Sequence, residues 1–261
     1  STTVIVSAVG LGSLGASAVL ARNVYRKRIK QNEATTPQKF HDSQKESLAN
    51  FFSGGAEKFQ KTPNLRLYQF QTCPYCFKVK SFLHYHKIPF TTVEVNPLNK
   101  NEISFSKYKK VPQLQLGENG PLIVDSNEII RMIKPILDQE NPKVTEEEEK
   151  WIKQSKSLLN LLVLNTNRNM KEAKENFSYA SSTNFSSKDK FLLANFLPVV
   201  MYFVTKRFIR PRVLREGGYK SDMDEREELY KDLNSWLDNG VGDGDFHGGK
   251  KPSLADLSYY G

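Results

Sequence analysis

The stretch LRLYQFQTCPYCFKVKSFLHYH, residues 65–86, decides the fold of this chain. Its first six residues, 65–70, combine apolar and aromatic side chains in a run typical of a short β-strand. Residues 73–86 repeat apolar side chains at helical spacing, at Val79, Phe82 and Leu83. The sequence therefore predicts a strand and a helix, with a Cys-Pro-Tyr-Cys motif where the helix begins.

Together with this strand and helix, the elements predicted after residue 86 give the order βαβαββα within about 75 residues. A second strand is expected at 90–95, and Asp125 or Ser126 is expected to cap a helix over 126–137. The remaining expected elements are a helix over 101–108 and a hairpin-like pair of strands at 112–116 and 121–124 around the turn 117–120. Helices that alternate with short strands predict an α/β domain.

The chain has two cysteines, and both belong to the motif. They exclude a framework of several disulfides, and a structural zinc site would need a second cysteine pair. Cys73 stands at a helix N-terminus, where backbone N–H groups and the helix dipole favour a thiolate, so we expect it to be the nucleophile. Cys76, one turn further, is placed to resolve a mixed disulfide. The alternative interpretation is a pair of unreactive surface thiols.

An uncharged apolar run, Val4–Ala21, opens the chain and is followed by a basic cluster within 22–30. Eighteen residues span about 27 Å as a helix, enough for a bilayer core. We therefore expect residues 1–30 to form a single-pass membrane anchor with its basic flank, and 31–62 to form a polar tether with one short helix. The alternative is a cleavable signal or transit peptide.

The formal net charge of +9 is concentrated at the N-terminal end, where residues 1–62 hold nine Lys/Arg against four Asp/Glu, a net of +5. Such a flank is typical of the cytosolic or matrix side of a membrane. No stripe of basic residues interleaved with stacking aromatics occurs in the folded part. Nucleic acid is therefore not an expected partner.

The sequence after the linker at 138–150 predicts an all-α region. Phe191–Val204 is strongly apolar but only fourteen residues long, which favours a buried core helix over a membrane span; the alternative is a lid or groove that touches membrane. Ser253-Leu-Ala-Asp256 is a candidate capping box. The chain stops five residues after this box, so we expect the helical domain to be truncated.

Residues 65–137, with the motif Cys73-Pro74-Tyr75-Cys76, resemble the glutaredoxin family, and 151–261 resemble the C-terminal domain of glutathione transferases. The resemblance implies a thioredoxin-like domain over 63–138 and an all-α transferase-like domain over 139–261, behind an N-terminal transmembrane helix. It also implies a cis bond between Val111 and Pro112, which would present the Val111 backbone to glutathione, and a γ-glutamyl site at Asp125 and Ser126.

The stretches from Leu67 to the last residue, among them LYQFQTCPYCFKVKSFLHYHKIPF and KPSLADLSYYG, resemble the second type of membrane-associated prostaglandin E synthase. That family implies an anchored dimer that isomerises a prostaglandin endoperoxide with the first thiol of the motif. It implies roles for Tyr75 and Phe77, glutathione as a cofactor, and haem with Cys73 as axial ligand; no other metal is expected. Gln71 departs from the family, which carries a lysine there, and Lys110 is the nearest substitute.

Two functions follow from these features. The first is a membrane-anchored thiol isomerase or glutathione-linked oxidoreductase that uses Cys73. The second is a non-catalytic accessory subunit of a mitochondrial inner-membrane respiratory complex that keeps the glutaredoxin-like domain as a scaffold. We expect the mitochondrial inner membrane with the folded part in the matrix; the alternative is the Golgi or another endomembrane, with the folded part in the cytosol.

Overall fold

The computed structural model describes residues 36–62, 64–138 and 143–261, so the predicted anchor at 4–21 lies outside the described residues. A four-stranded sheet in the order β2-β1-β3-β4 forms the centre of the first domain. β1 pairs in parallel with β2 and antiparallel with β3, and β3 pairs antiparallel with β4. The strands are β1 Arg66–Gln69, β2 Thr91–Glu94, β3 Gln113–Gln115 and β4 Leu122–Val124.

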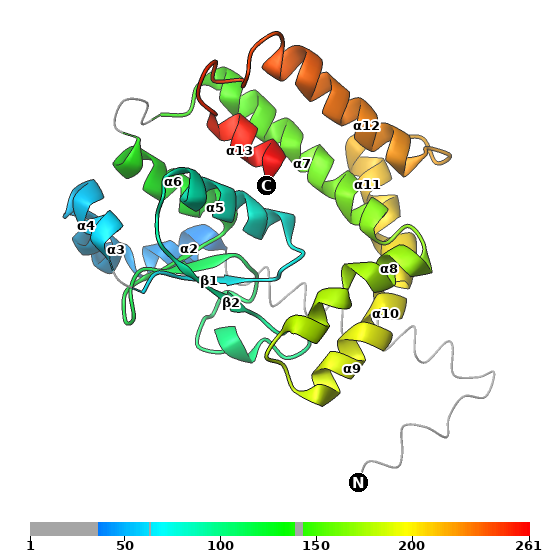
Figure 1. The fold of residues 1–261 in the computed structure, drawn as a ribbon, viewed down its shortest axis with the longest axis horizontal. Coiled ribbons are helices and arrows are strands. Elements are labelled where there is room, and N and C mark those ends of the chain that lie inside the picture. The colour runs from blue at the N-terminus through cyan, green and yellow to red at the C-terminus, as the bar shows by residue number, and fades with distance from the viewer. Residues whose placement is uncertain (1–35, 63, 139–142) are drawn as a thin grey trace.

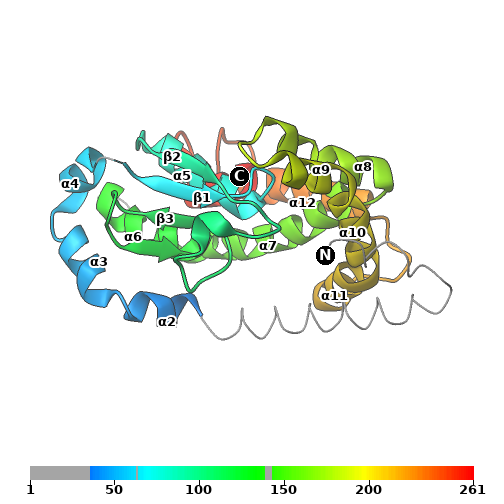
Figure 2. The ribbon, with the colours of Figure 1, turned by 90° about the horizontal axis from the view of Figure 1, so that it is seen from below.

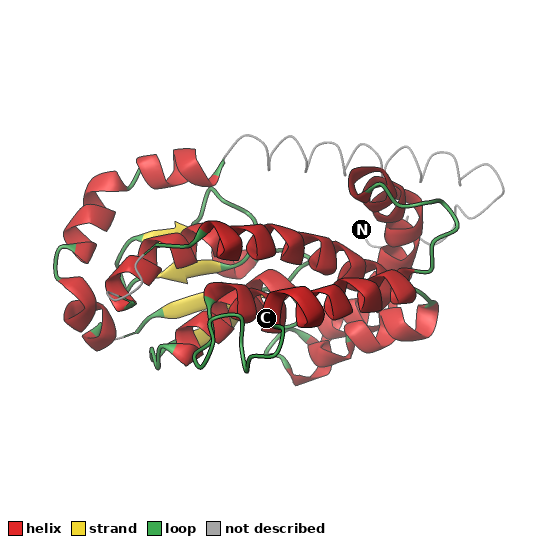
Figure 3. Ribbon diagram, turned by 90° about the horizontal axis from the view of Figure 1, so that it is seen from above, coloured by secondary structure: helices red, strands yellow, loops and turns green. Residues whose placement is uncertain are grey.

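The parallel pair β1–β2 needs a crossover, and helix α5 (Pro74–Tyr85) supplies it. Helix α6 (Ser126–Leu137) follows β4, and a single 3₁₀ turn, η1 (Asn101–Ile103), replaces the longer helix expected over 101–108. This is the thioredoxin-like arrangement expected for the domain. The other described residues are mostly helical, as the secondary-structure colouring in Figure 3 makes plain.

The two faces of the sheet bury two separate apolar clusters, because successive side chains of a strand point to opposite faces. Leu67 of β1 faces a cluster built on α5 and α6, with Val79, Phe82 and Ile133 all fully buried. Tyr68, the next residue, faces the second cluster together with residues such as Val95, Ile103 and Val124. The first cluster fixes α5, and therefore the Cys-Pro-Tyr-Cys motif, against the sheet.

Residues 37–61 form three helices, where the sequence predicted a polar tether with one short helix. They pack on the domain because Leu48 and Phe59 enter its core. They also cover the edge strand β4. The Gln44 side chain donates to the Leu122 carbonyl at 3.2 Å and accepts the Leu122 N–H at 3.1 Å, and the Val124 N–H donates to His41 Nε2 at 3.0 Å. These bonds occupy backbone groups of an edge strand that could otherwise pair with another chain. The helices are α2 Pro37–Asp42, α3 Lys45–Phe52 and α4 Gly55–Lys61.

Acid is expected to weaken the docking of α2 on β4. Burial lowers the pKa of His41, so the folded state holds fewer protons than the unfolded state below the ordinary histidine pKa of about 6.5. Stability therefore falls as the pH drops through about 6.5, because a protonated ring cannot accept the N–H of Val124. Hydrogen exchange of that amide, followed from pH 7 to pH 5, should show this loss. His41→Gln keeps an acceptor without a titrating ring, and an equal pH dependence in this variant would contradict the prediction.

The second domain packs its helices around α7, with α13 between α7 and α5 (Figure 1). Glu148 joins the starts of two helices: its carboxylate accepts from Thr145 N–H (2.9 Å) in the capping box of α7 and from Leu254 N–H (3.2 Å) in α13. The capping box predicted at Ser253 and Asp256 is confirmed. The helices are α7 Glu146–Thr166, α8 Met170–Asn176, η2 Ser178–Ser182, α12 Glu225–Trp236, η4 Leu237–Val241 and α13 Leu254–Tyr260.

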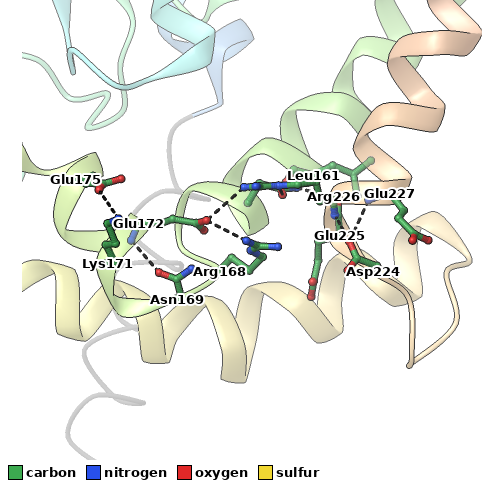
Figure 4. Close-up of polar contacts among 11 residues, drawn as sticks. Leu161, Arg168, Asn169, Lys171, Glu172, Glu175, Asp224, Glu225, Arg226 and Glu227 are labelled. Carbon is green, nitrogen blue, oxygen red and sulfur yellow. Dashed lines mark hydrogen bonds and ion pairs between the residues drawn. The ribbon is translucent and has the colours of Figure 1, made fainter.

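A polar network holds α8 against α12 (Figure 4). The Glu172 carboxylate accepts from Arg168 at 3.2 Å and from Arg226 at 3.3 Å. Asn169 caps α8 by accepting the N–H of Glu172 at 3.0 Å. Asn165, at the end of α7, donates to the backbone carbonyl of Glu225 at 2.9 Å. One carboxylate thus fixes the ends of three helices, which orients the part of the second domain nearest the sheet.

The prediction of a buried core helix at 191–204 is wrong. A continuous helix runs from Ser187 to Gly217 through α9 (Ser187–Asn195), α10 (Leu197–Val204), a π turn at Thr205–Ile209 and α11 (Arg210–Gly217). Only 17% of its most apolar window is buried, and by length and composition alone this helix could cross a membrane. The prediction failed because apolar content does not reveal which neighbours cover a helix.

Candidate functional site

Cys73 is the N-cap residue of α5, as the motif predicted, and Pro74 occupies the first helical position. The Cys73 carbonyl accepts the N–H groups of Cys76 (3.0 Å) and Phe77 (3.1 Å), which begins the helix. Its own N–H donates to Phe70 at 3.0 Å. Proline has no N–H to leave unsatisfied at this position, so the sequence starts the helix directly beneath the sulfur.

The two thiols differ in the direction of their pKa shifts. The neighbouring Cys76 thiol and the backbone N–H groups of Cys76 and Tyr75 hold the pKa of Cys73 below its ordinary value. Burial, followed by the interaction with Cys73, raises the pKa of Cys76. Both sulfurs are free, and Cys76 is the more buried. The arrangement places the more acidic thiol at the half-buried position and the less acidic thiol behind it.

Glu94 is a functional candidate that the sequence reasoning missed. Its carboxylate accepts the N–H of Gln71 at 2.7 Å and the side-chain amide of Gln69 at 3.2 Å, so it holds the loop that leads into Cys73. Its negative charge also raises the pKa of Cys73, against the effect of the Cys76 thiol and the backbone N–H groups of Cys76 and Tyr75. Burial raises the pKa of Glu94 itself. An acid at the carboxyl end of a parallel strand was the available signal, because that edge lies beside the start of α5.

Glu94→Gln is expected to make Cys73 more acidic. The substitution removes the charge that opposes thiolate formation and keeps an acceptor for Gln71 N–H, and its new amide N–H can meet Gln69 Oε1, which is buried without a partner. The pKa of Cys73 should fall by a few tenths to about one unit. The pH midpoint of Cys73 alkylation measures this shift.

Glu102→Gln is the matched control, because Glu102 also caps a backbone N–H, that of Asn96 at 2.9 Å, but is not among the groups that shift the pKa of Cys73. The pH midpoint of Cys73 alkylation in Glu102→Gln should equal that of the parent protein. An unchanged or raised midpoint in Glu94→Gln would remove the electrostatic role given to this carboxylate.

The bond between Val111 and Pro112 is cis, as expected. The loop before it is held by the buried Gln113, whose side-chain amide donates to the carbonyls of Tyr108 (2.6 Å) and Lys110 (2.7 Å). Among the described residues, the N–H and C=O of Val111 take part in no backbone hydrogen bond. The backbone N–H and C=O of this half-buried residue can therefore form hydrogen bonds with an extended ligand.

Asp125 and Ser126 form the start of α6. Asp125 has a left-handed φ of 74° and caps the helix by accepting Asn127 N–H at 3.0 Å. Ser126 is buried beneath it. Asn127 in turn accepts the buried Lys78 of α5 at 3.0 Å, and burial lowers the pKa of Lys78 to about 8. A helix N-terminus of this kind suits a carboxylate.

The other predicted site residues are placed differently. Tyr75 is partly exposed beside Cys73, and burial followed by the Cys73 charge raises its pKa, so its hydroxyl is protonated near neutral pH. Phe77 points along α5 toward the second domain and lines a cavity of about 570 Å³ with Leu257 and Tyr260 of α13. Lys110 is exposed and makes no ion pair with another described residue. The structure does not bring Phe77 together with Val111 or Asp125.

The second domain also borders the site. The charge of Arg212, on α11, acts on Tyr75. Tyr179, in η2, is half-buried, and burial followed by the charges of Glu94 and Cys73 raises its pKa. Neither residue was predicted from the sequence, because both come from a distant part of the chain. The motif therefore lies where the two domains meet.

The described residues give no support for haem. They contain no group of three or more His, Cys, Asp or Glu side chains that could hold a metal ion. Cys73 is not among the residues that line the cavities of about 870, 360 and 570 Å³.

Comparison with known proteins agrees with this fold. A family model described as glutathione S-transferase, N-terminal domain, matches residues 67–140. The chain is 31% identical over 245 residues to prostaglandin E synthase 2 from Mus musculus, a match that covers 76% of this chain and 62% of the relative. It is 30% identical over 247 residues to prostaglandin E synthase 2 from Danio rerio, covering 76% and 63%.

Among solved structures, the chain is similar to glutaredoxin 2 from Salmonella typhimurium in complex with glutathione, at 15% identity and a TM-score of 0.45, covering 74% of this chain and 80% of that one. The chain spans 62% and 63% of the length of the two curated relatives. The chain is thus similar to prostaglandin E synthase 2 over 76% of its length, and residues 67–140 match the N-terminal domain of glutathione S-transferases.

Proposed function

We propose that this protein is a thiol-dependent enzyme in which Cys73 is the reactive group. The observation that carries the proposal is the Cys73 thiol at the N-cap of α5, where the Cys76 thiol and the backbone N–H groups of the first helical turn lower its pKa. A thiolate is the reactive form of cysteine, so this position is suited to nucleophilic or base chemistry. The names of the two relatives support an activity on a prostaglandin endoperoxide.

For an endoperoxide, the Cys73 thiolate would take the proton from a carbon that carries a peroxide oxygen. The electron pair of that C–H bond forms a carbonyl, the O–O bond breaks, and the second oxygen receives a proton. Tyr75 is protonated near neutral pH and close to Cys73, which suits it to donate that proton. The product is an isomer of the substrate, so the step needs no external oxidant or reductant.

Glutathione is the proposed co-substrate or cofactor. The unpaired backbone of Val111, before the cis bond to Pro112, can pair with the peptide part of glutathione. The α6 N-terminus at Asp125 and Ser126 suits its γ-glutamyl carboxylate. Lys110 is the exposed cation nearest in sequence to this edge. In a disulfide-reducing reaction, Cys73 would attack a disulfide sulfur and Cys76 or glutathione would resolve the mixed disulfide.

The proposed location is a membrane, through a single span at 4–21, with the mitochondrial inner membrane and its matrix side as the expected setting. The apolar run and its basic flank support this placement. A homodimer is the proposed assembly, on the family resemblance alone.

A scaffold subunit of a mitochondrial membrane complex is the second candidate. Two observations favour it: Gln71 stands where the family carries a lysine, and the Glu94 carboxylate binds the Gln71 backbone and opposes ionisation of Cys73. Both features reduce the reactivity that an enzyme needs. The protein would then keep the fold while the thiols serve no reaction.

Product analysis tests the proposal. The full chain, in detergent or vesicles, is given a prostaglandin endoperoxide with and without glutathione, and in parallel a small disulfide with glutathione. An isomerised product, or glutathione-dependent reduction of the disulfide, above the rate without protein is the expected result. No acceleration of either reaction would reject the enzyme and leave the scaffold.

A further inference from the structure

Four phenylalanines stand out of the long helix Ser187–Gly217 into solvent. Phe191 is 67% exposed, Phe196 and Phe203 are each 61% exposed, and Phe208 is 42% exposed. Phe196 and Phe203 are seven residues apart and share one side of the helix, and we call these two side chains the phenylalanine surface. Isolated exposed aromatics are normal, but two exposed rings on one side of a helix form an apolar surface of the kind that marks an interaction site.

Helical spacing continues this surface along α10. Phe196, Val200, Phe203 and Arg207 follow one another at intervals of three or four residues, so they share one stripe of the helix. Val200 is half-buried and the others are exposed. The opposite side of the helix faces the protein, since Pro198 and Thr205 are buried. This part of the helix is thus amphipathic, and its apolar side faces outward.

The stripe changes from apolar to basic along the helix. Residues 197–217 hold Lys206, Arg207, Arg210, Arg212 and Arg215 against a single acid, Glu216. Arg210 pairs with Glu225 and Arg212 pairs with Glu216. Lys206, Arg207 and Arg215 form no ion pair with another described residue. Exposed aromatics followed by unpaired cations are the composition of helices that lie at an anionic lipid surface.

The basic end of this helix lies on the same side of the molecule as α2. In Figure 2 the first described helix, α2, and the basic helix α11 both project at the lower edge of the molecule, toward its opposite ends, and α10 leads away from that edge. The apolar run 4–21 precedes α2 by fifteen residues in the sequence. A span formed by that run would therefore hold the α2 and α11 side of the molecule near the bilayer.

We propose that the phenylalanine surface and the cations of residues 206–215 form a second membrane contact, which docks the folded part on an anionic lipid surface. The phenylalanine rings enter the boundary between headgroups and acyl chains, and Lys206, Arg207 and Arg215 meet the phosphates. Because Arg212 on the same helix acts on Tyr75, this contact lies beside the Cys73 site.

A second copy of the chain fits this surface less well. A two-fold interface places the same patch of both subunits face to face. The unpaired cations at 206, 207 and 215 would then approach their own copies, and like charges across an interface oppose binding. Anionic lipid supplies the complementary charge instead.

The test places a fluorescent reporter on the surface of the full chain. Phe203→Trp is compared with Tyr230→Trp, whose parent side chain is similarly exposed (56%) but belongs to α12, which is set back from the lower edge in Figure 2. The two native tryptophans, Trp151 and Trp236, are buried. Each variant is reconstituted into vesicles of phosphatidylcholine, with or without phosphatidylglycerol, made from ordinary or brominated lipid.

The expected result is that brominated lipid quenches the Phe203→Trp reporter several times more strongly than the Tyr230→Trp reporter, and more strongly when phosphatidylglycerol is present. Arg207→Gln in the Phe203→Trp background should reduce the dependence on phosphatidylglycerol. Equal quenching of the two reporters would overturn the proposal. Failure of the chain to associate with vesicles would also overturn it. A Phe203→Trp reporter that brominated lipid does not quench, together with cross-linking between two copies through α10, would do the same.

Discussion

Cys73→Ser is expected to lower the turnover of either proposed reaction by a factor of roughly 10³ or more. The hydroxyl of serine stays protonated at neutral pH, so the groups that lower the pKa of Cys73 have no anion to stabilise. The fold should survive, since serine is itself a favourable N-cap residue for α5. Initial rates with the endoperoxide and with a disulfide measure the effect, and thermal unfolding controls for stability.

Cys76→Ser distinguishes the chemistry that Cys73 performs. An isomerase needs only the first thiolate, and a serine hydroxyl at position 76 can still donate a hydrogen bond to it, so most turnover should remain. A dithiol route requires the second sulfur to resolve the mixed intermediate, so both substitutions should then be severe. Full activity of Cys73→Ser would contradict any enzymatic role of the motif. In a scaffold neither substitution should alter assembly of the partner complex.

Trp236→Ala is expected to reduce the free energy of unfolding by about 3–5 kcal/mol. Trp236 is buried at the end of α12 and stacks on Tyr259 of α13, with the ring centroids 4.1 Å apart and 6° between the planes. It also meets Trp151 of α7 edge-on at 5.2 Å. One side chain thus joins three helices, and its loss leaves a cavity that they cannot close without moving. Chemical denaturation followed by circular dichroism measures the loss.

The matched control for this prediction is Tyr230→Ala, an exposed aromatic on the same helix, which should change the free energy of unfolding by less than about 0.5 kcal/mol. α13 also contacts α5, so Trp236→Ala should loosen the support beneath the motif. A loss below about 1 kcal/mol in Trp236→Ala would mean that the aromatic cluster does not hold the second domain.

The sequence predicted the centre of the fold because its local signals agree with one another. Pro74 follows Cys73 at a helix start, the apolar side chains of α5 recur at helical spacing, and Asp125 and Ser253 stand at true helix caps. Each of these signals lies within a few residues of the element that it specifies. The relation between Cys73 and Cys76 follows from the same local geometry.

Features that depend on distant contacts were not predictable in this way. The helices at 37–61 are short, and such helices owe their stability to packing, here that of Leu48 and Phe59, rather than to local sequence. The exposure of Phe203 depends on which neighbours surround its helix. Glu94 reaches the motif only because β2 lies beside β1. Sequence reasoning therefore found the thiols but not the groups that tune them.

The central claim is that Cys73 is an activated thiol, and the pH dependence of its alkylation tests this most directly. The full chain is treated with iodoacetamide at a series of pH values, and the modified peptide is quantified by mass spectrometry, so that Cys73 is followed separately from the buried Cys76. The structure predicts a midpoint for Cys73 below that of a free model thiol measured under the same conditions. A midpoint at or above that of a free model thiol would contradict the account.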